Sequence, residues 1–153
     1  MNLSVRAELL RRNQVTAPSR ELKAIFPLST RRAVFVLDDD QSVRTGIQRL
    51  IKAHGFEAKL FDSIEALDGG ANLADATCLV LDINLNGSSG IEFRRRLTAR
   101  GHSVPVIFIT ASDKEAVRRD ALDAGCIAYL TKPFPAKALI EAIKTATAHP
   151  ADI

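Results

Sequence analysis

Six polar side chains stand close behind four apolar stretches of the sequence, and their chemical types suit the binding of phosphate and metal. They are Asp38, Asp39, Asp40, Asp82, Thr110 and Lys132. The apolar stretches have the character of buried strands. The carboxyl ends of parallel strands share one edge of a sheet, where open α/β proteins bind their ligands. We therefore expect the carboxylates, the hydroxyl and the ammonium group to converge in one crevice.

The carboxylates predict a magnesium site. Carboxylates that lie close together repel one another, so a site that keeps them together usually holds a cation. Mg²⁺ prefers oxygen and is typically held by one or two carboxylates, with waters and a substrate phosphate as further ligands. We expect Asp39 and Asp82 to bind Mg²⁺ directly, Asp38 to bind it through water, and the backbone carbonyl of Asn84 to be a ligand.

Asp82 is the candidate nucleophile among these carboxylates. It ends an apolar stretch alone and precedes a glycine-rich turn at residues 86–90, which would let a ligand approach closely. Aspartate can attack phosphorus and form an acyl phosphate. Lys132 would then pair with one phosphoryl oxygen, and the Thr110 hydroxyl would donate to another. The added charge would act as a switch that repositions the loops carrying these two residues.

Each of these residues also has a plainer explanation. A single aspartate after a strand often forms a turn or caps a helix, and Asp40 or Ser42 could simply cap the next helix. Lys132 and Pro133 could belong to an ordinary loop. The joint arrangement favours a functional site, because the polar groups follow successive strands with consistent spacing.

From residue 33 onward the sequence alternates between strand-like and helix-like patterns. The expected strands are 33–37, 57–61, 77–82, 105–109 and 127–130, and the expected helices are 41–53, 63–69, 89–99, 113–124 and 136–148. Five successive βα units predict an α/β fold with a five-stranded parallel sheet, doubly wound by helices on both faces. Gly55, Gly101 and Gly125 are expected to end three of the helices.

The composition indicates one soluble domain with an appendage. The chain has 153 residues, of which 46% are hydrophobic and 25% charged. No apolar run approaches the ~18 residues needed to span a bilayer, and the N-terminus lacks the apolar core of a secretory signal. Cys78 and Cys126 lie in apolar stretches, where a thiol behaves as a small hydrophobe. We therefore expect a reduced, cytoplasmic protein.

The positive charge gathers near the N-terminus. The pI is 9.1, but residues 1–32 hold seven Lys or Arg and two Glu, a net +5, which leaves −2 for the rest of a chain whose total is +3. The remainder has no basic stripe for a nucleic-acid backbone. We expect residues 1–30 to be a flexible basic extension, 31–149 to form the folded domain and 150–153 to be a tail. A weak helical pattern in the extension leaves open a contact with a partner or membrane surface.

From about Ala33 to Ala148 the chain resembles a response-regulator receiver domain of bacterial two-component signalling, which has a flavodoxin-like (βα)5 fold. The resemblance rests on the acidic pair Asp38 and Asp39, on Asp82, on Ile109-Thr110-Ala111 and on Lys132-Pro133-Phe134. It implies that Asp82 accepts a phosphoryl group and that Thr110 is the switch hydroxyl. It also implies that the orientation of Tyr129, the aromatic on the last strand, follows phosphorylation. An ordinary half-buried aromatic would explain Tyr129 equally well.

The resemblance implies partners and a mode of action as well. A sensor histidine kinase or a phosphotransfer protein would donate the phosphoryl group, and a downstream protein effector would respond to it. The sequence ends at Ile153, directly after the last expected helix, so we expect no output domain and no direct DNA binding. Signalling would use protein contacts, with a homodimer through helices 113–124 and 136–148 as one form. The chain would catalyse only its own phosphorylation and dephosphorylation.

One departure concerns the loop after Asp82. Receivers commonly have a proline four residues after the phosphoacceptor, where this chain has Asn86, so we expect a looser loop.

Two other functions fit part of the pattern. In a phosphohydrolase of the haloacid-dehalogenase type, Asp38 and Asp40 would supply the nucleophile and the acid. That fold needs further carboxylates after Lys132, where only Glu141 and Asp152 remain. A binding module could use the receiver fold without phosphorylation, since a fold alone does not prove a function. The three histidines, His54, His102 and His149, do not adjoin these residues, and we expect them to be solvated.

Overall fold

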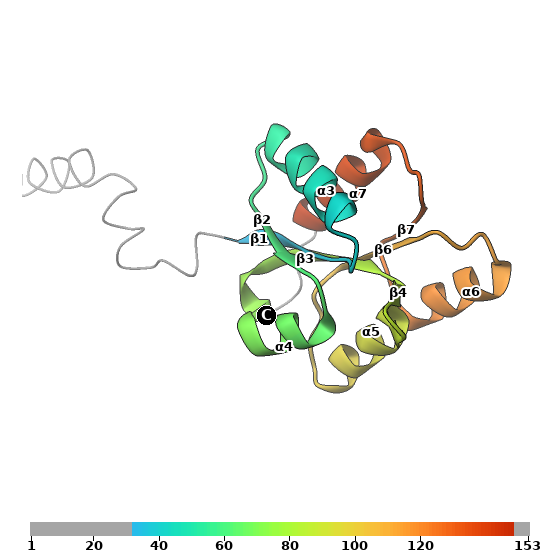
Figure 1. Ribbon diagram of the computed structural model, residues 1–153. Helices are drawn as coiled ribbons and strands as arrows, with labels where there is room; N and C mark the ends of the chain where they lie inside the picture. Colours follow the sequence, from blue (N-terminus) through green and yellow to red (C-terminus); the bar gives the residue numbers. More distant parts are fainter. Residues whose placement is uncertain (1–31, 149–153) are drawn as a thin grey trace, which may run out of the picture. The chain divides into compact units, whose positions relative to one another are not determined.

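Five apolar stretches form one parallel sheet in the computed structural model, which describes residues 32–148 (Figure 1). The strands are β1 (Ala33–Leu37), β2 (Ala58–Phe61), β3 (Ala76–Asp82), β6 (Val106–Thr110) and β7 (Ala128–Thr131). Their order across the sheet is β2-β1-β3-β6-β7, and every neighbouring pair is parallel. After β1 and β2 the chain crosses to the other side of β1, where β3, β6 and β7 complete the sheet. The predicted doubly wound fold is therefore confirmed.

Five α-helices cover the two faces of this sheet. They are α3 (Gln41–Ala53), α4 (Ile64–Gly70), α5 (Gly90–Ala99), α6 (Glu115–Ala124) and α7 (Ala136–Ala148). Figure 1 shows α3 and α7 together on one side of the sheet, with α4 and α5 on the other. A short 3-10 helix, η1 (Leu73–Asp75), precedes β3 and was not predicted. The predicted strand and helix boundaries agree with the structure to within two residues.

Alternate side chains of each strand pack into two separate core layers. Phe35 and Phe108 join the layer that includes residues of α4, α5 and α6, whereas Val36 and Ile107 join the layer that includes residues of α3 and α7. All four side chains are fully buried. Strands with helices on both faces must be apolar on both sides, which explains their continuous rather than alternating hydrophobicity. The polar residues that follow the strands therefore stand out as exceptions to an apolar interior.

The helix ends follow from local hydrogen bonding. The Asp40 carboxylate accepts the backbone N–H groups of Ser42 and Val43 at 2.8 and 3.4 Å, so it caps the first turn of α3. The expectation that Asp40 caps a helix is thus confirmed. The three glycines expected to end helices have φ of +84°, +85° and +91°, and they are Gly55, Gly101 and Gly125.

A small hairpin follows Asp82 in the segment that leads to α5. β4 (Asn84–Leu85) and β5 (Ser88–Ser89) pair in antiparallel fashion, joined by Asn86 and Gly87. These two residues have φ of +47° and +86°. Two central residues with positive φ are typical of the type I′ turn, which Asn-Gly favours most strongly. The glycine-rich turn that the sequence indicated at residues 86–90 is thus part of a hairpin, and the expectation of a looser loop stays a prediction.

Several sequence expectations lie outside the described residues: the basic extension at residues 1–30, the tail at 150–153 and the solvation of His149. Within residues 32–148, none of the helices has both the length and the apolar character needed to cross a membrane. Cys78 is buried and Cys126 is half-buried, and neither forms a disulfide. Burial raises the pKa of the Cys78 thiol to about 12, so this thiol stays protonated as a core residue does.

Candidate functional site

Strand pairing brings the acidic residues together at one edge of the sheet. Leu37 lies opposite Leu81 in the parallel pair β1–β3, so the next residues, Asp38 and Asp82, are neighbours. Asp38 is fully buried and Asp82 is 5% exposed, although both are carboxylic acids. Together with the half-buried Asp39, they offer carboxylate oxygens that all lie within 4.8 Å of one another.

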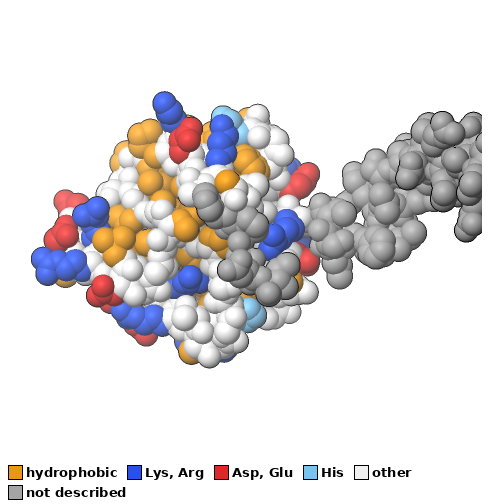
Figure 2. Space-filling model, turned by 180° about the vertical axis from the view of Figure 1, so that it is seen from behind, with side chains coloured by type: hydrophobic (Ala, Val, Ile, Leu, Met, Phe, Trp, Pro, Cys, Tyr) orange, Lys and Arg blue, Asp and Glu red, His pale blue; other side chains and the backbone are white. Residues whose placement is uncertain are grey.

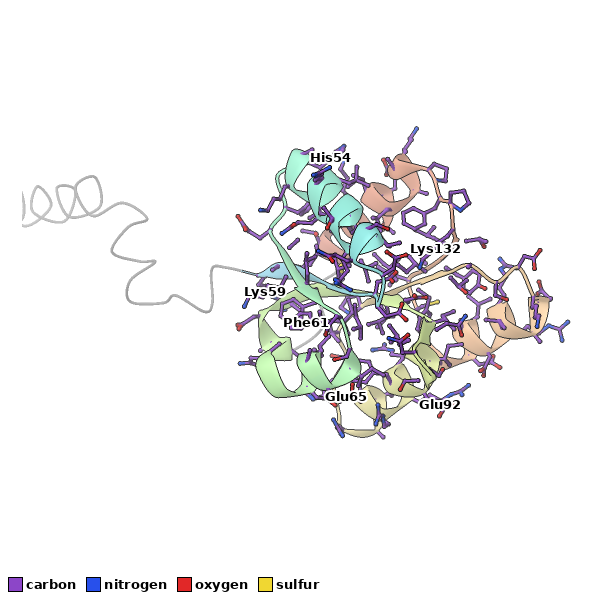
Figure 3. All side chains as sticks on the ribbon, viewed as in Figure 1. His54, Lys59, Phe61, Glu65, Glu92 and Lys132 are labelled. Atoms are coloured by element: carbon purple, nitrogen blue, oxygen red, sulfur yellow. The ribbon has the colours of Figure 1, made fainter. Side chains whose placement is uncertain are left out.

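Lys132 lies in the loop that follows the edge strand β7, and its side chain reaches this acidic cluster (Figure 3). Its Nζ donates to Asp38 Oδ2 at 2.8 Å and to Asp82 Oδ2 at 3.3 Å. The peptide bond that joins Lys132 to Pro133 is cis. The ammonium group thus lies between two buried carboxylates, one directly after β1 and one at the end of β3.

Burial and neighbouring charges shift the pKa values of Asp82 and Lys132. Burial raises the pKa of Asp82 to about 6, and the Asp38 carboxylate adds to this rise, while Lys132 opposes it. Burial alone would lower the pKa of Lys132. The hydrogen bond to Asp38 and the negative charges of Asp82 and Asp38 outweigh burial, so the pKa of Lys132 is raised. At neutral pH the site therefore contains a firmly charged ammonium group and a carboxylate that is ionised at some energetic cost.

Backbone and side-chain donors orient the two buried acids. The Asp40 N–H donates to Asp38 Oδ1 at 2.9 Å, and the Asn84 N–H donates to Asp82 Oδ1 at 3.2 Å. In addition, the Arg44 guanidinium donates to the Asp38 carbonyl oxygen at 2.6 Å. Sequence reasoning did not single out Arg44. Its position four residues after the cap Asp40 was the available signal, because residues one helical turn apart lie on the same face.

Thr110 ends β6, the strand next to β3, and is fully buried. Asp82 lies opposite Ile109 in this pair, so Thr110 lies one residue further along the neighbouring strand. Its hydroxyl oxygen accepts the Ser112 N–H at 3.0 Å. Within the described part of the chain, its side chain forms no hydrogen bond with the acids.

Tyr129 connects to the same loop as Thr110. The Tyr129 hydroxyl donates to the Ser112 carbonyl oxygen at 3.4 Å, and burial raises the pKa of Tyr129. Ser112 therefore contacts Thr110 through its N–H group and Tyr129 through its carbonyl group. The two residues expected to act as a switch are linked through one intervening residue of the β6–α6 loop.

Two of the three histidines, which we expected to lie away from the site, are on the surface. His54 ends α3, and its Nδ1 lies 3.0 Å from the Leu50 carbonyl oxygen (Figure 3). His102 follows α5. Both histidines are exposed, in agreement with the expected solvation.

A family model described as the response regulator receiver domain matches residues 34–144. This chain belongs to the response-regulator receiver family. The match spans all five strands of the sheet and most of α7, the last helix. The matched residues include Asp38, Asp39, Asp82, Thr110 and Lys132, on which the resemblance rests.

Full-length response regulators share this receiver domain. Response regulator protein TmoT of Ectopseudomonas mendocina is 32% identical over 113 residues, which are 74% of this chain and 51% of TmoT. Nodulation protein W of Bradyrhizobium diazoefficiens is 33% identical over 119 residues, 78% of this chain and 52% of that protein. Response regulator MprA of Mycobacterium avium is 37% identical over 109 residues, 70% and 47% of the two chains. The chain thus spans about half the length of the curated relatives it matches.

Solved receiver structures have the same fold. A response regulator receiver protein from Burkholderia phymatum is 40% identical, with a TM-score of 0.65, and the match covers 80% of this chain and 99% of that one. The response regulator StyR is 40% identical with a TM-score of 0.70, covering 78% and 60% of the two chains. The structure of FixJ-N is 28% identical with a TM-score of 0.70, and the match covers 80% of this chain and 98% of that one.

Proposed function

We propose that this receiver domain takes a phosphoryl group onto Asp82 from a sensor histidine kinase or a phosphotransfer protein, in a magnesium-dependent reaction. The phosphorylated domain would signal through altered contacts with a downstream protein. One observation carries the proposal: the Lys132 ammonium group lies within hydrogen-bond distance of both Asp38 and Asp82, beside a third carboxylate.

The donor set fits Mg²⁺. Each of the three carboxylates offers a hard oxygen ligand, the type that Mg²⁺ prefers, and these oxygens lie within 4.8 Å of one another. Asp39 and Asp82 would bind directly with the Asn84 carbonyl. Asp38 would bind through water, because its two oxygens already accept from Lys132 and from the Asp40 N–H at 2.8 and 2.9 Å, whereas the corresponding contacts of Asp82 are longer, 3.3 and 3.2 Å. A bound Mg²⁺ would neutralise the charge that develops on the phosphoryl oxygens.

Asp82 would be the nucleophile in the transfer. With a pKa of about 6, its carboxylate is mostly ionised at pH 7. A carboxylate oxygen attacks phosphorus as the bond from phosphorus to the donor's imidazole nitrogen breaks. The imidazole keeps the electron pair of that bond and takes up a proton, and Asp82 becomes an acyl phosphate. Lys132 would then transfer one of its hydrogen bonds to a phosphoryl oxygen.

Thr110 and Tyr129 would carry the signal away from Asp82. A threonine hydroxyl can accept the Ser112 N–H and still donate its own hydrogen to a phosphoryl oxygen. Drawing Thr110 toward the phosphoryl group would pull on Ser112, whose carbonyl group holds the Tyr129 hydroxyl. The orientation of Tyr129 would follow.

The output surface would involve α6 and α7, either with a downstream effector or in a homodimer. Leu122 in α6 and Ile127 before β7 are 49% and 41% exposed, the large hydrophobic side chains most open to solvent in residues 32–148. Figure 2 shows hydrophobic side chains gathered on the face of the molecule that is seen from behind. We propose that this domain contacts its protein partner in the cytoplasm. Residues 32–148 carry 15 Lys or Arg and 15 Asp or Glu, and this balance does not favour direct DNA binding.

The test is phosphorylation by a small acyl-phosphate donor, followed by mass spectrometry of the intact protein. The wild type should gain a phosphoryl group only with Mg²⁺, and Asp82→Asn should gain none. Asp123→Asn, which changes an exposed carboxylate of α6, should be labelled like the wild type. An unlabelled wild type, or equal labelling of Asp82→Asn, would contradict the proposal.

A phosphorylation-independent binding module is the second candidate. It is favoured by the pairing of Asp38 and Asp82 with Lys132, which stabilises the acids without any ligand. The two functions differ in one measurement. If Asp82→Ala leaves all partner binding unchanged in the presence of the phosphoryl donor, the binding-module function is correct.

A further inference from the structure

Asn86 stands in a chemically distinctive position. The sequence contains five asparagines, and Asn86 is the one followed by glycine. Asn86 and Gly87 form the exposed tip of the β4–β5 hairpin. The proposed function assigns no role to either residue.

An asparagine side chain can be attacked by the backbone nitrogen of the next residue. A side chain on that next residue hinders the attack, so glycine permits it most readily. The surroundings of Gly87 are open, since a Cβ built there would meet nothing within 4 Å. Among the described residues, the Gly87 N–H donates no hydrogen bond that would hold its nitrogen in place.

The hairpin is also short enough to open locally. Its ladder consists of two residue pairs, Asn84 with Ser89 and Leu85 with Ser88. Two-stranded hairpins of this size are only marginally stable by themselves, and loop tips open at little free-energy cost. Brief opening would let the backbone rotate about Asn86 until the Gly87 nitrogen faces the side-chain amide carbon.

We propose that Asn86 is a site of spontaneous deamidation in the native protein. The Gly87 nitrogen loses its proton and forms a bond to Asn86 Cγ, and the side-chain nitrogen leaves as ammonia. The resulting five-membered imide then takes up water at one of its two carbonyl carbons. Opening at one carbon gives aspartate, and opening at the other gives isoaspartate, in which the main chain runs through the former side chain. The net change is amide plus water to carboxylate plus ammonium.

Both products alter the hairpin beside the acidic cluster. Each adds a negative charge four residues after Asp82. Isoaspartate also lengthens the main chain by one methylene group within a two-residue turn, which breaks the register of the short ladder. The hairpin base is tied to the end of β3, because the Gly90 N–H donates to the Ile83 carbonyl oxygen at 2.9 Å. Isoaspartate would therefore weaken the support of the loop that follows Asp82.

The experiment is timed incubation of the purified full chain at physiological temperature and mildly alkaline pH. Peptides are then mapped by a mass-spectrometric fragmentation method that separates aspartate from isoaspartate. Asn72 and Asn84 are internal controls, because leucine follows each of them. Asn86 should convert at least about tenfold faster than either control, which corresponds to about 1.4 kcal/mol in activation free energy.

Gly87→Ala is the second arm, and it should slow conversion at Asn86 several-fold. The assay does not depend on phosphorylation, so the two proposals can fail separately. Conversion of Asn86 no faster than that of Asn84, or conversion only after the protein is unfolded in denaturant, would overturn the proposal.

Discussion

A Cβ atom on Gly90 would lie 2.3 Å from the backbone carbonyl oxygen of Asp82. The first residue of α5 is therefore packed against the main chain of the residue that we propose as phosphoacceptor. No side chain can occupy this space unless the backbone moves, because the atom in contact cannot rotate away.

Gly90→Ala should destabilise the protein by roughly 2–3 kcal/mol, because the new methyl group pushes α5 away from β3. It should also slow phosphorylation by displacing Asp82. Urea unfolding and acyl-phosphate labelling measure the two effects. Gly46→Ala is the matched control, since a Cβ at Gly46, inside α3, meets nothing within 4 Å. Equal stability of the two variants would contradict the packing argument.

Asp82→Asn should stabilise the Mg²⁺-free protein at neutral pH. The folded pKa of Asp82 is about 6, above the value of about 3.9 for an unfolded chain. Between these values the folded state binds more protons, so the contribution of Asp82 to stability falls as the pH rises from about 4 to about 6. Asparagine does not ionise, so Asp82→Asn does not lose stability over this pH range. It should be more stable than the wild type by roughly 1–2 kcal/mol at pH 7–8. The advantage should vanish near pH 4.

Urea unfolding at several pH values, without divalent cations, measures this difference. The argument fails if Asp82→Asn shows the same stability difference from the wild type at pH 4 and at pH 8.

Mg²⁺ should raise the free energy of unfolding, and its removal by a chelator should reverse the gain. A ligand at ten times its dissociation constant stabilises the folded state by about 1.4 kcal/mol. Asp39→Asn should lose most of this gain if Asp39 binds Mg²⁺ directly, as we propose. Asp40→Asn should keep it, since Asp40 caps α3 and asparagine caps equally well. Thermal unfolding with and without Mg²⁺ distinguishes the two neighbours. An equal Mg²⁺ response of both variants would argue against Asp39 as a ligand.

Lys132→Met should leave two buried carboxylates without their shared cation. We expect a loss of about 1–3 kcal/mol in stability at neutral pH, partly recovered in acid as Asp82, whose pKa is raised by burial, becomes protonated. The rate of phosphorylation should fall by about tenfold or more, because no ammonium group remains to neutralise the phosphoryl oxygens. Lys137→Met, an exposed position on α7, is the control. Labelling of Lys132→Met at the wild-type rate would show that the ammonium group is not needed for transfer.

Much of the fold could be predicted because the signals are local. Hydrophobic periodicity fixed the strand and helix boundaries to within two residues, and glycines of positive φ end the helices as expected. The hairpin at Asn86 was missed although its signal was also local. The Asn-Gly pair at residues 86–87 is the strongest short signal for a type I′ turn.

The site was only partly predictable. The types of residue at the strand ends indicated an acidic crevice, but the burial and the partners of the three consecutive aspartates do not follow from their spacing. In the structure, Asp38 is fully buried against Lys132, Asp39 is half-buried, and Asp40 is exposed and caps α3. Arg44, which contacts the Asp38 carbonyl group, was not singled out.

By itself, the sequence determined that this chain alternates strands with helices and places polar groups after the strands, because hydrophobic periodicity and turn residues act over a few neighbouring positions. Only the tertiary structure decided that Lys132 lies between Asp38 and Asp82, 94 and 50 residues away along the chain. Such contacts depend on the order of the strands across the sheet, which long-range packing selects and which no local pattern encodes.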